Sequence, residues 1–502
     1  MKPGKQWFGI AGLLFAGSGV LLLHAQPYRA NTVISTAGGC GMRVDVIGSR
    51  TSQADGFVVL LHGLSANKRV MFYLAESFSN QSLRVFTPDL PGHGASPGPF
   101  SYDRAESCTE ALVEDLIERH AILPERTLLV GHSLGGAIAL RVATHIPVAG
   151  VIAISPAPMR PTPGISREML PFRNFGALPS NSLVISGGWE PAPQKTAARN
   201  LVPTQPGSSD KYVVIPRATH VSLLFNSEVA AQDRAWVARV LKIPSDSPIP
   251  PHWSLLGFVL GFAGLSILVV PFLREVAGNL DEPPKPETLS APLLWISLAQ
   301  IVVVATLAVS ALSAGVPLRA LRIFQGDYLV SFFALAGMAL LIWNRRLAAS
   351  AFQTRSRPLL AAAFAAIALI VLFGAWFNLS FYDAWLTSAR WLRLPIVALL
   401  LLPWLFAEEL LLGPARPESR WSRYFLSLGF RTIAWGALVA ALFFLHSGEI
   451  LLLLLSVYFA IFFALERLAA ALVRRETHSP AAAAIFGAIL FAGLALAIFP
   501  VA

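Results

Sequence analysis

The sequence predicts two kinds of structure in one chain. Residues 32–245 read as an α/β fold, a mainly parallel sheet with helices on both faces, and residues 254–502 read as an all-α, multi-span membrane domain. In the first region short β-rich runs alternate with amphipathic helical segments, and in the second long apolar runs repeat. Over all 502 residues, 55% are hydrophobic and only 14% are charged, whereas soluble domains carry about 25% charged residues.

The chain has a net charge of +10, and the placement of its basic residues indicates a membrane protein rather than a nucleic-acid binder. Its arginines fall mostly between apolar runs, where topology signals lie, and not in a polar basic domain. We therefore expect no nucleic-acid partner. The two cysteines, Cys40 and Cys108, are too few for a cysteine metal site. The sequence leaves open whether they pair, which an exported domain would permit.

Residues 1–31 contain an apolar run, 7–25, preceded by Lys2 and Lys5. Such a segment is either a cleaved signal peptide or a retained signal anchor. The run exceeds the usual 7–15 apolar residues of a signal peptide, and "LHA" is a poor cleavage site, so the anchor is favoured. Both interpretations export the region that follows.

The α/β region has seven expected strands and two clear helices. The helices are expected over 108–120 and 230–241, because apolar residues recur there at helical spacing. Residues 246–253, rich in proline, read as a linker. The strands are expected within 43–48, 57–63, 83–90, 126–133, 148–156, 181–188 and 211–217.

The membrane domain is expected to have about eight helices, each close to the roughly 20 residues that span a bilayer. They are placed near 254–273, 291–312, 328–344, 359–377, 396–412, 432–446, 450–468 and 480–500.

Basic residues in the connections predict the orientation. With the N-terminus inside, cytoplasmic connections hold 13 basic residues and the opposite ones hold 4, so the positive-inside rule puts the α/β domain on the non-cytoplasmic side. The first group is Arg274, Lys285, Arg345, Arg346, Arg355, Arg357, Arg416, Arg420, Arg423, Arg431, Arg467, Arg474 and Arg475; the second is Arg319, Arg322, Arg390 and Arg393.

The stretch "GHSLG", residues 131–135, places Ser133 between an apolar β-run and a helical run. Flanking glycines permit the sharp strand-to-helix turn that exposes a nucleophilic serine. Serine is a weak nucleophile and needs a base, so this motif alone leaves a purely structural turn open.

The companion motifs favour catalysis. "LLHG" (60–63) ends a strand, and the next residue, Leu64, is expected to donate one oxyanion N–H beside that of Leu134. Glu190 in "GGWEP" and His220 in "RATH" each follow a later strand. Ser133, Glu190 and His220 therefore meet at one rim of the sheet, where open α/β folds build their sites.

With "LHG", "DLPGHG", "GHSLGG" and "ATH" in this order, residues 32–245 resemble an α/β-hydrolase of the lipase, esterase and serine-aminopeptidase type. The resemblance implies Ser133 as nucleophile, His220 as base and Glu190 as the acid that orients the imidazole. Glu190 departs from the family's usual aspartate, and Asp210 is the reserve candidate. His62, His93, His132 and Asp89 are expected to brace loops or the turn around the nucleophile.

No motif implies a cofactor, a metal or a nucleotide. Only about 25 residues separate the strands near 154 and 181, too few for a large helical lid. An open or lightly covered site near a membrane suits a small-molecule or lipid ester as substrate, with membrane lipid as a further partner. Protein partners are not indicated.

In the membrane domain, Glu408 and Glu409 are adjacent, and His446 lies one span later. These weakly resemble the intramembrane CAAX-protease (abortive-infection) family, in a degenerate form. Gly413 stands where that family has an arginine, and Leu442 where it has a phenylalanine; a later histidine is missing. The plain alternative is a pair of structural glutamates at the membrane boundary.

The sequence therefore predicts a membrane-anchored serine hydrolase that cleaves ester, or else amide, bonds. Two alternatives stay open. In the first, the chain is mainly a transporter or CAAX-type peptidase with an accessory hydrolase domain. In the second, its hydrolase fold is catalytically silent and used for binding.

Overall fold

The computed structural model of the chain divides it into two compact units. We call residues 22–256, 377–383 and 500–502 the sheet unit, and residues 1–21, 257–376 and 384–499 the helical unit. The structure describes residues 3–25, 29–48, 54–159, 178–203, 209–244, 248–278, 291–315, 319–346, 356–413, 420–445 and 447–502.

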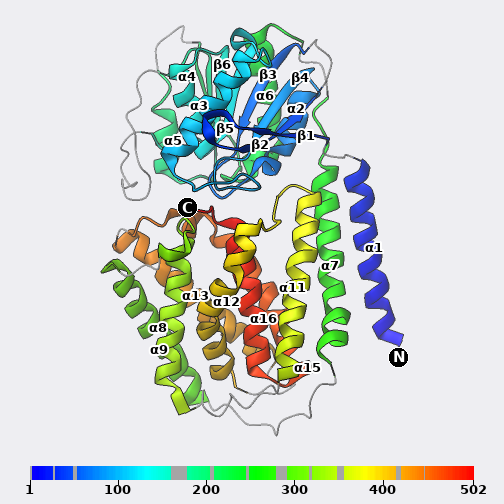
Figure 1. The fold of residues 1–502 in the computed structure, drawn as a ribbon, viewed down its shortest axis with the longest axis vertical. Helices are drawn as coiled ribbons and strands as arrows, with labels where there is room; N and C mark the ends of the chain where they lie inside the picture. The colour runs from blue at the N-terminus through cyan, green and yellow to red at the C-terminus, as the bar shows by residue number, and fades with distance from the viewer. Residues whose placement is uncertain are drawn as a thin grey trace. The chain divides into compact units, whose positions relative to one another are not determined.

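The sheet unit is built on eight strands in the order β1-β2-β4-β3-β5-β6-β7-β8 (Figure 1). β2 pairs antiparallel with β1 and β4, and all other neighbours are parallel. The strands are β1 (Asn31–Ser35), β2 (Met42–Ile47), β3 (Gly56–Leu61), β4 (Leu83–Pro88), β5 (Thr127–His132), β6 (Gly150–Ile154), β7 (Ser182–Gly187) and β8 (Lys211–Ile215). The predicted α/β fold is confirmed, with β1 as an additional antiparallel edge strand.

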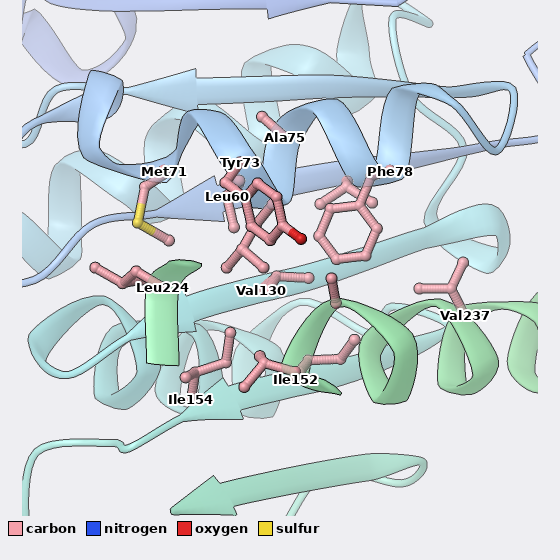
Figure 2. Close-up of a cluster of buried hydrophobic side chains, with 14 of the residues drawn as sticks. Leu60, Met71, Tyr73, Ala75, Phe78, Val130, Ile152, Ile154, Leu224 and Val237 are labelled. Carbon is pink, nitrogen blue, oxygen red and sulfur yellow. The ribbon is translucent and has the colours of Figure 1, made fainter. Parts of the chain in front are cut away.

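Helices cover both faces of the sheet because the central strands are apolar on both sides. α2 and α6 pack on one face, while α3 and α4 pack together on the other. Figure 2 shows strand residues such as Leu60, Val130 and Ile152 meeting Phe78 of α2 and Val237 of α6. The helices of this unit are α2 (Phe72–Ser79), α3 (Tyr102–Glu118), α4 (Leu134–His145), α5 (Ala192–Arg199) and α6 (Ser227–Leu241), with short 3₁₀ turns η1 (Ala37–Gly39), η2 (Lys68–Met71), η3 (Pro124–Arg126) and η4 (Ser222–Phe225).

Cys40 and Cys108 form a disulfide, which the sequence left open. Cys40 follows η1, Cys108 lies in α3, and their Cα atoms are 5.9 Å apart. The bond therefore ties the edge of the sheet to a covering helix across 68 residues of sequence. Such bonds persist in oxidising compartments and are rare in the cytosol.

Two short segments from distant parts of the sequence complete the sheet unit. Residues 377–383 come from the end of α11 and the start of the connection to α12, and residues 500–502 from beyond α16. Val501 pairs with the loop after β4: its N–H donates to Gly92 O over 3.0 Å, and its carbonyl accepts from Phe100 N–H over 2.7 Å.

Among the described residues, nine helices are long and apolar enough to span a membrane, one near the N-terminus and eight further along. α9 and α12 approach closely, because a Cβ on Gly337 would lie 2.2 Å from Trp404 N. The helices that lie wholly or mainly in the helical unit are α1 (Pro3–Ala25), α7 (Trp253–Ala277), α8 (Ala291–Ser313), α9 (Gly326–Trp343), α11 (Ser356–Leu379), α12 (Ser388–Leu411), α13 (Arg420–Phe444), α14 (Ile450–Leu454), α15 (Ser456–Thr477) and α16 (Pro480–Ile498), with the turn η5 (Arg319–Leu321).

Three of the predicted spans differ from the helices. The span expected at 396–412 begins at Ser388, so Arg390, expected in a connection, lies buried inside α12. The span expected at 432–446 begins at Arg420, and the one expected at 450–468 is divided at Leu455 into α14 and α15. An arginine ends the apolar run from which a span is predicted. Helices α13 and α15 continue past their arginines because buried carboxylates neutralise the guanidinium groups. Arg431, Arg467 and Arg474, expected in connections, accordingly lie buried inside α13 and α15.

Candidate active site

The carboxyl ends of the parallel strands bring the expected residues to one rim of the sheet. Ser133 follows β5, and its N–H donates to Ile154 O of the neighbouring strand over 2.9 Å. Glu190 follows β7, and His220 follows β8. Parallel strands put such residues at a common edge, which is where open α/β sheets bind ligands.

Ser133 lies on a strained turn between β5 and α4. Its φ and ψ are 53° and −116°, a region that non-glycine residues rarely adopt. The flanking glycines make this turn possible. A Cβ on Gly131 would lie 2.2 Å from Gly135 O, and one on Gly135 would lie 2.4 Å from Leu61 O. The turn therefore has the geometry of a nucleophile elbow.

His220 is held by Glu190 on one side of its imidazole. Nδ1 lies 2.7 Å from Glu190 Oε1, and the carboxylate side chain is fully buried. Gly187 N–H donates to the other oxygen, Glu190 Oε2, over 2.8 Å. An Nδ1–H directed at the carboxylate leaves Nε2 unprotonated, which is the tautomer that a general base needs.

Glu190 is ionised at neutral pH. Burial alone would raise its pKa, but the hydrogen bond and charge of His220, with hydrogen bonds from Ser155 and the Gly187 amide, lower the pKa below its ordinary value. The carboxylate can therefore stabilise an imidazolium that forms beside it.

Two residues that the sequence analysis missed complete this cluster. Ser155, which follows β6, donates its hydroxyl hydrogen to Glu190 Oε1 and lies 2.8 Å from His220 Nδ1. Gln194 of α5 donates from Nε2 to Ser155 Oγ over 3.0 Å. The strand "VIAIS" ends at the same rim. The argument that located Glu190, that residues after parallel strands meet at one edge, therefore applies to Ser155 as well.

His132 connects the elbow to the histidine loop. Its Nε2–H donates to the backbone carbonyl of His220 over 2.9 Å, and the two ring centroids are 4.6 Å apart. Burial, together with the charge of His220, keeps the pKa of His132 well below its ordinary value. His132 is therefore neutral. It directly precedes Ser133 in the chain and anchors His220, as expected for a residue that braces the turn.

Ser133 and His220 are both described, and no direct hydrogen bond joins Ser133 Oγ to the imidazole. Catalytic contacts of this kind are often long without substrate and tighten in the Michaelis complex. Ser133 as a residue is half-buried.

Leu134 and the loop that carries Leu64, the two expected sources of oxyanion donors, both lie next to Ser133. Leu134 is the first residue of α4, where helix N–H groups have no partner within the helix. The preceding loop approaches from the other side, since a Cβ on Gly63 would lie 3.2 Å from Ser133 Cβ. Gly63 O accepts from His62 Nδ1–H over 2.8 Å and from Ala66 N–H over 3.2 Å. In a trans peptide the N–H points away from the C=O. The two hydrogen bonds to Gly63 O therefore also fix the direction of the Leu64 N–H.

His62, His93 and Asp89 brace the loops, as expected. His62 Nε2 accepts from Leu90 N–H over 3.0 Å, and burial lowers the pKa of His62. His93 Nε2 accepts from Ser65 N–H over 3.2 Å. Asp89 binds Lys68 through both the ammonium group, at 2.7 Å, and the backbone N–H, at 2.8 Å. These contacts join the loop after β3 to the loop after β4.

Asp210, the reserve acid, lies away from this cluster. It precedes β8, and its Oδ1 accepts from Ser182 N–H at the start of β7 over 2.8 Å. Asp210 is therefore at the amino ends of these strands, on the opposite rim. In the part of the chain that the structure describes, no group of three or more His, Cys, Asp or Glu side chains is arranged to hold a metal ion.

Glu408 and Glu409 of α12 are bound by arginines within the helical unit. Arg431 of α13 bridges Glu408, at 3.0 Å, and Glu466. Arg467 and Arg474 of α15 both bind Glu409. His446, the third residue of the CAAX-type resemblance, lies outside the described residues. Neither glutamate is a free carboxylate of the kind that a glutamate-based peptidase uses.

Comparison with known proteins supports the fold and leaves the activity to be proposed. Residues 58–265 match a model described as the alpha/beta hydrolase family. A pimeloyl-[acyl-carrier protein] methyl ester esterase of Edwardsiella ictaluri is 34% identical over 119 residues, 22% of this chain and 43% of the relative. Lipase LipV of Mycobacterium tuberculosis is 32% identical over 104 residues, 20% of this chain and 37% of the relative. The chain thus spans less than half of the length of either relative.

Solved structures match over a similar region. An α/β serine hydrolase without a lid from Xanthomonas campestris is 17% identical, with a TM-score of 0.34, over 43% of this chain and 97% of that one. The strand order, the elbow at Ser133 and the family model agree with one another. Residues 58–265 of this chain therefore match the alpha/beta hydrolase family, and the sheet unit has the alpha/beta hydrolase fold.

Proposed function

We propose that the chain is a serine hydrolase that cleaves carboxylic esters through an acyl-enzyme. Ser133 attacks the ester carbonyl while His220 Nε2 takes its proton, and the imidazolium then protonates the leaving alcohol. Water attacks the acyl-enzyme in the second half of the reaction, again with His220 as the base. The N–H groups of Leu64 and Leu134 stabilise the oxyanion.

The observation that carries this proposal is the hydrogen bond of 2.7 Å between buried Glu190 and His220 Nδ1, at the rim that holds the strained Ser133. A carboxylate in this position fixes the imidazole tautomer and stabilises its protonated form. Ser155 lies on the Nδ1 side and donates to Glu190, so it is assigned a positioning role.

Esters with an apolar acyl group, from small molecules or lipids, are the proposed substrates. The printed names of the similar relatives, a methyl ester esterase and a lipase, support ester cleavage. The rim also includes Trp189, an apolar residue that is 67% exposed and precedes Glu190. The sequence leaves open whether the site is open or is covered by residues 158–174, and this segment falls mostly outside the described residues.

We further infer a multi-pass protein with its hydrolase domain on the non-cytoplasmic side. Nine membrane-length helices among the described residues and the Cys40–Cys108 disulfide support this arrangement. After the buried arginines of α13 and α15 are set aside, the basic residues of the expected cytoplasmic connections still outnumber those of the opposite ones. Helix α1 then serves as the signal anchor.

The CAAX-type peptidase is not part of the proposed function. Its two glutamates are neutralised by Arg431, Arg467 and Arg474. Breaking such a buried pair leaves an uncompensated charge, whereas an intact pair contributes to how helices pack. We assign Glu408 and Glu409 this packing role in the helical unit.

Labelling with a fluorophosphonate tests the proposal. The full chain should be labelled, and Ser133→Ala should abolish labelling because the attacking oxygen is gone. Ser155→Ala should still be labelled, at a lower rate, since Ser133 remains. Equal labelling of the wild type and Ser133→Ala would refute the assignment. Loss of labelling in Ser155→Ala alone would move the nucleophile to Ser155.

A further inference from the structure

The segment 377–383 lies against both loops that would carry the reaction, although it is more than 150 residues away from His220 in sequence. It belongs to the sheet unit, while the residues on either side of it belong to the helical unit. It comprises the end of α11 and the start of the connection to α12. Its contacts fall into two groups, one on the oxyanion loop and one on the histidine loop.

Tyr382 and Asp383 hold the loop that follows β3. The Tyr382 hydroxyl donates to Ser65 O over 3.1 Å, and Asp383 N–H donates to Asn67 Oδ1 over 3.2 Å. Asn67 Nδ2 donates in return to Asp383 O over 3.3 Å. Asn67 is buried, with an exposed fraction of 1%, so these hydrogen bonds are shielded from water.

These bonds act on the residue next to the expected oxyanion donor. Ser65 has φ +58°, in the left-handed region, which costs free energy for a non-glycine residue. His93 fixes its N–H and Tyr382 fixes its carbonyl. The peptide groups on both sides of Ser65 are therefore held. The first of them is joined through Leu64 to the Gly63–Leu64 peptide, which carries the expected donor N–H.

Phe381 contacts the second loop. Its ring meets that of Phe225 edge-to-face, with centroids 5.7 Å apart. Phe225 ends η4, the turn that begins two residues after His220. One short segment therefore spans the loop of the oxyanion donor and the loop of the general base.

Charge also connects the segment to the loop after β3. Burial alone would lower the pKa of Lys68, but the carboxylates of Asp89, Asp45 and Asp383 together raise it. The buried ammonium group of Lys68 therefore lies in the field of Asp383 as well as in its ion pair with Asp89.

We propose that residues 380–383 are a positioning element of the active site, and that Tyr382 is a positioning residue for the Leu64 oxyanion donor. The proposal rests on the serine hydrolase function proposed above. Because the oxyanion forms only after attack, a misdirected donor lowers kcat and leaves KM unchanged. Turnover then depends on a connection between two membrane-length helices.

The test compares Tyr382→Phe with Tyr424→Phe in the full chain. Both remove a tyrosine hydroxyl that donates to a carbonyl; that of Tyr424 binds Ala464 O, over 3.3 Å, within the helical unit. Active sites are counted with a fluorophosphonate, and kcat and KM are measured with a p-nitrophenyl acyl ester. Tyr382→Phe should lower kcat per active site about 3- to 10-fold, as expected for one lost hydrogen bond, with KM unchanged. Tyr424→Phe should keep the wild-type kcat.

A wild-type kcat per active site in Tyr382→Phe would overturn the positioning role, even if fewer molecules fold. An equal decrease in Tyr424→Phe would do so as well. Absence of Ser133-dependent labelling in the wild type would instead refute the hydrolase function itself.

Discussion

At the scale of the residue, two serines at the same rim have different surroundings. Ser133 lies at the strained end of β5 and is partly accessible. Ser155 is fully buried and shares Glu190 Oε1 with His220. A hydroxyl that already donates to a carboxylate on the Nδ1 side of the imidazole stabilises the ion pair there. The nucleophile must face Nε2, so the two hydroxyls are not interchangeable.

The assignment of Glu190 as the acid gives a residue-scale prediction. Glu190→Gln should lower kcat about 10³- to 10⁴-fold, because a neutral amide cannot stabilise the imidazolium of His220. Asp210→Asn is the matched control: it keeps the acceptor for Ser182 N–H and lies on the other rim, so its kcat should stay near that of the wild type. Steady-state hydrolysis of an ester measures both, and the reverse ranking would make Asp210 the acid.

At the scale of the element, the elbow between β5 and α4 depends on close backbone approach. Gly131 and Gly135 leave no room for a side chain, because β3 and the turn itself lie within 2.2–2.4 Å of their Cβ positions. The strain at Ser133 is thus maintained by packing on both sides. The neighbouring loops are fixed in the same way, through His62, His93 and the pair of Lys68 with Asp89.

Substitution at the elbow gives the element-scale prediction. In Gly135→Ala the new Cβ would lie 2.4 Å from Leu61 O, so the helix or the strand must shift. We expect the free energy of unfolding to fall by about 1–3 kcal/mol and kcat to fall by about 10²-fold or more, since a displaced oxyanion donor costs this much.

Thermal unfolding and ester hydrolysis measure the two effects. Gly436→Ala, at a helix position where nothing lies within 4 Å of the Cβ, should leave both near the wild-type values. A fully active and stable Gly135→Ala would show that the tight approach at the elbow is unnecessary.

At the scale of the whole molecule, the hydrolase domain is not continuous in sequence. Its compact unit takes in residues 377–383 and 500–502 in addition to 22–256. Both added segments bind loops at the active-site rim, one at Ser65 and Asn67 and the other at Gly92 and Phe100. A fragment that ends after α6 therefore lacks backbone partners that the full chain provides.

Removal of residues 500–502 from the full chain tests this dependence. It leaves Phe100 N–H and Gly92 O without their partners on Val501, so the sheet unit should lose about 1–3 kcal/mol of its free energy of unfolding. Val501→Ala keeps both backbone hydrogen bonds and should cost much less. Chemical denaturation followed by the loss of ester hydrolysis measures this, and equal stability of the two variants would contradict the expected role of the backbone pairing.

The sequence by itself determined the α/β fold, the rim at which the strands end, and the apolar helices. These depend on periodicity and on short motifs, which act over a few residues. It also pointed to Ser133, Glu190 and His220, because a parallel sheet collects whatever follows each strand at a single edge.

Only the tertiary structure decided the Cys40–Cys108 bond and the hydrogen bond of Ser155 to Glu190. It also decided the arginine partners of Glu408 and Glu409 and the contact of Tyr382 with Ser65. Each of these is a contact between residues far apart in the chain. Such contacts depend on packing geometry and on the neutralisation of buried charge, for which no local pattern of residues provides a signal.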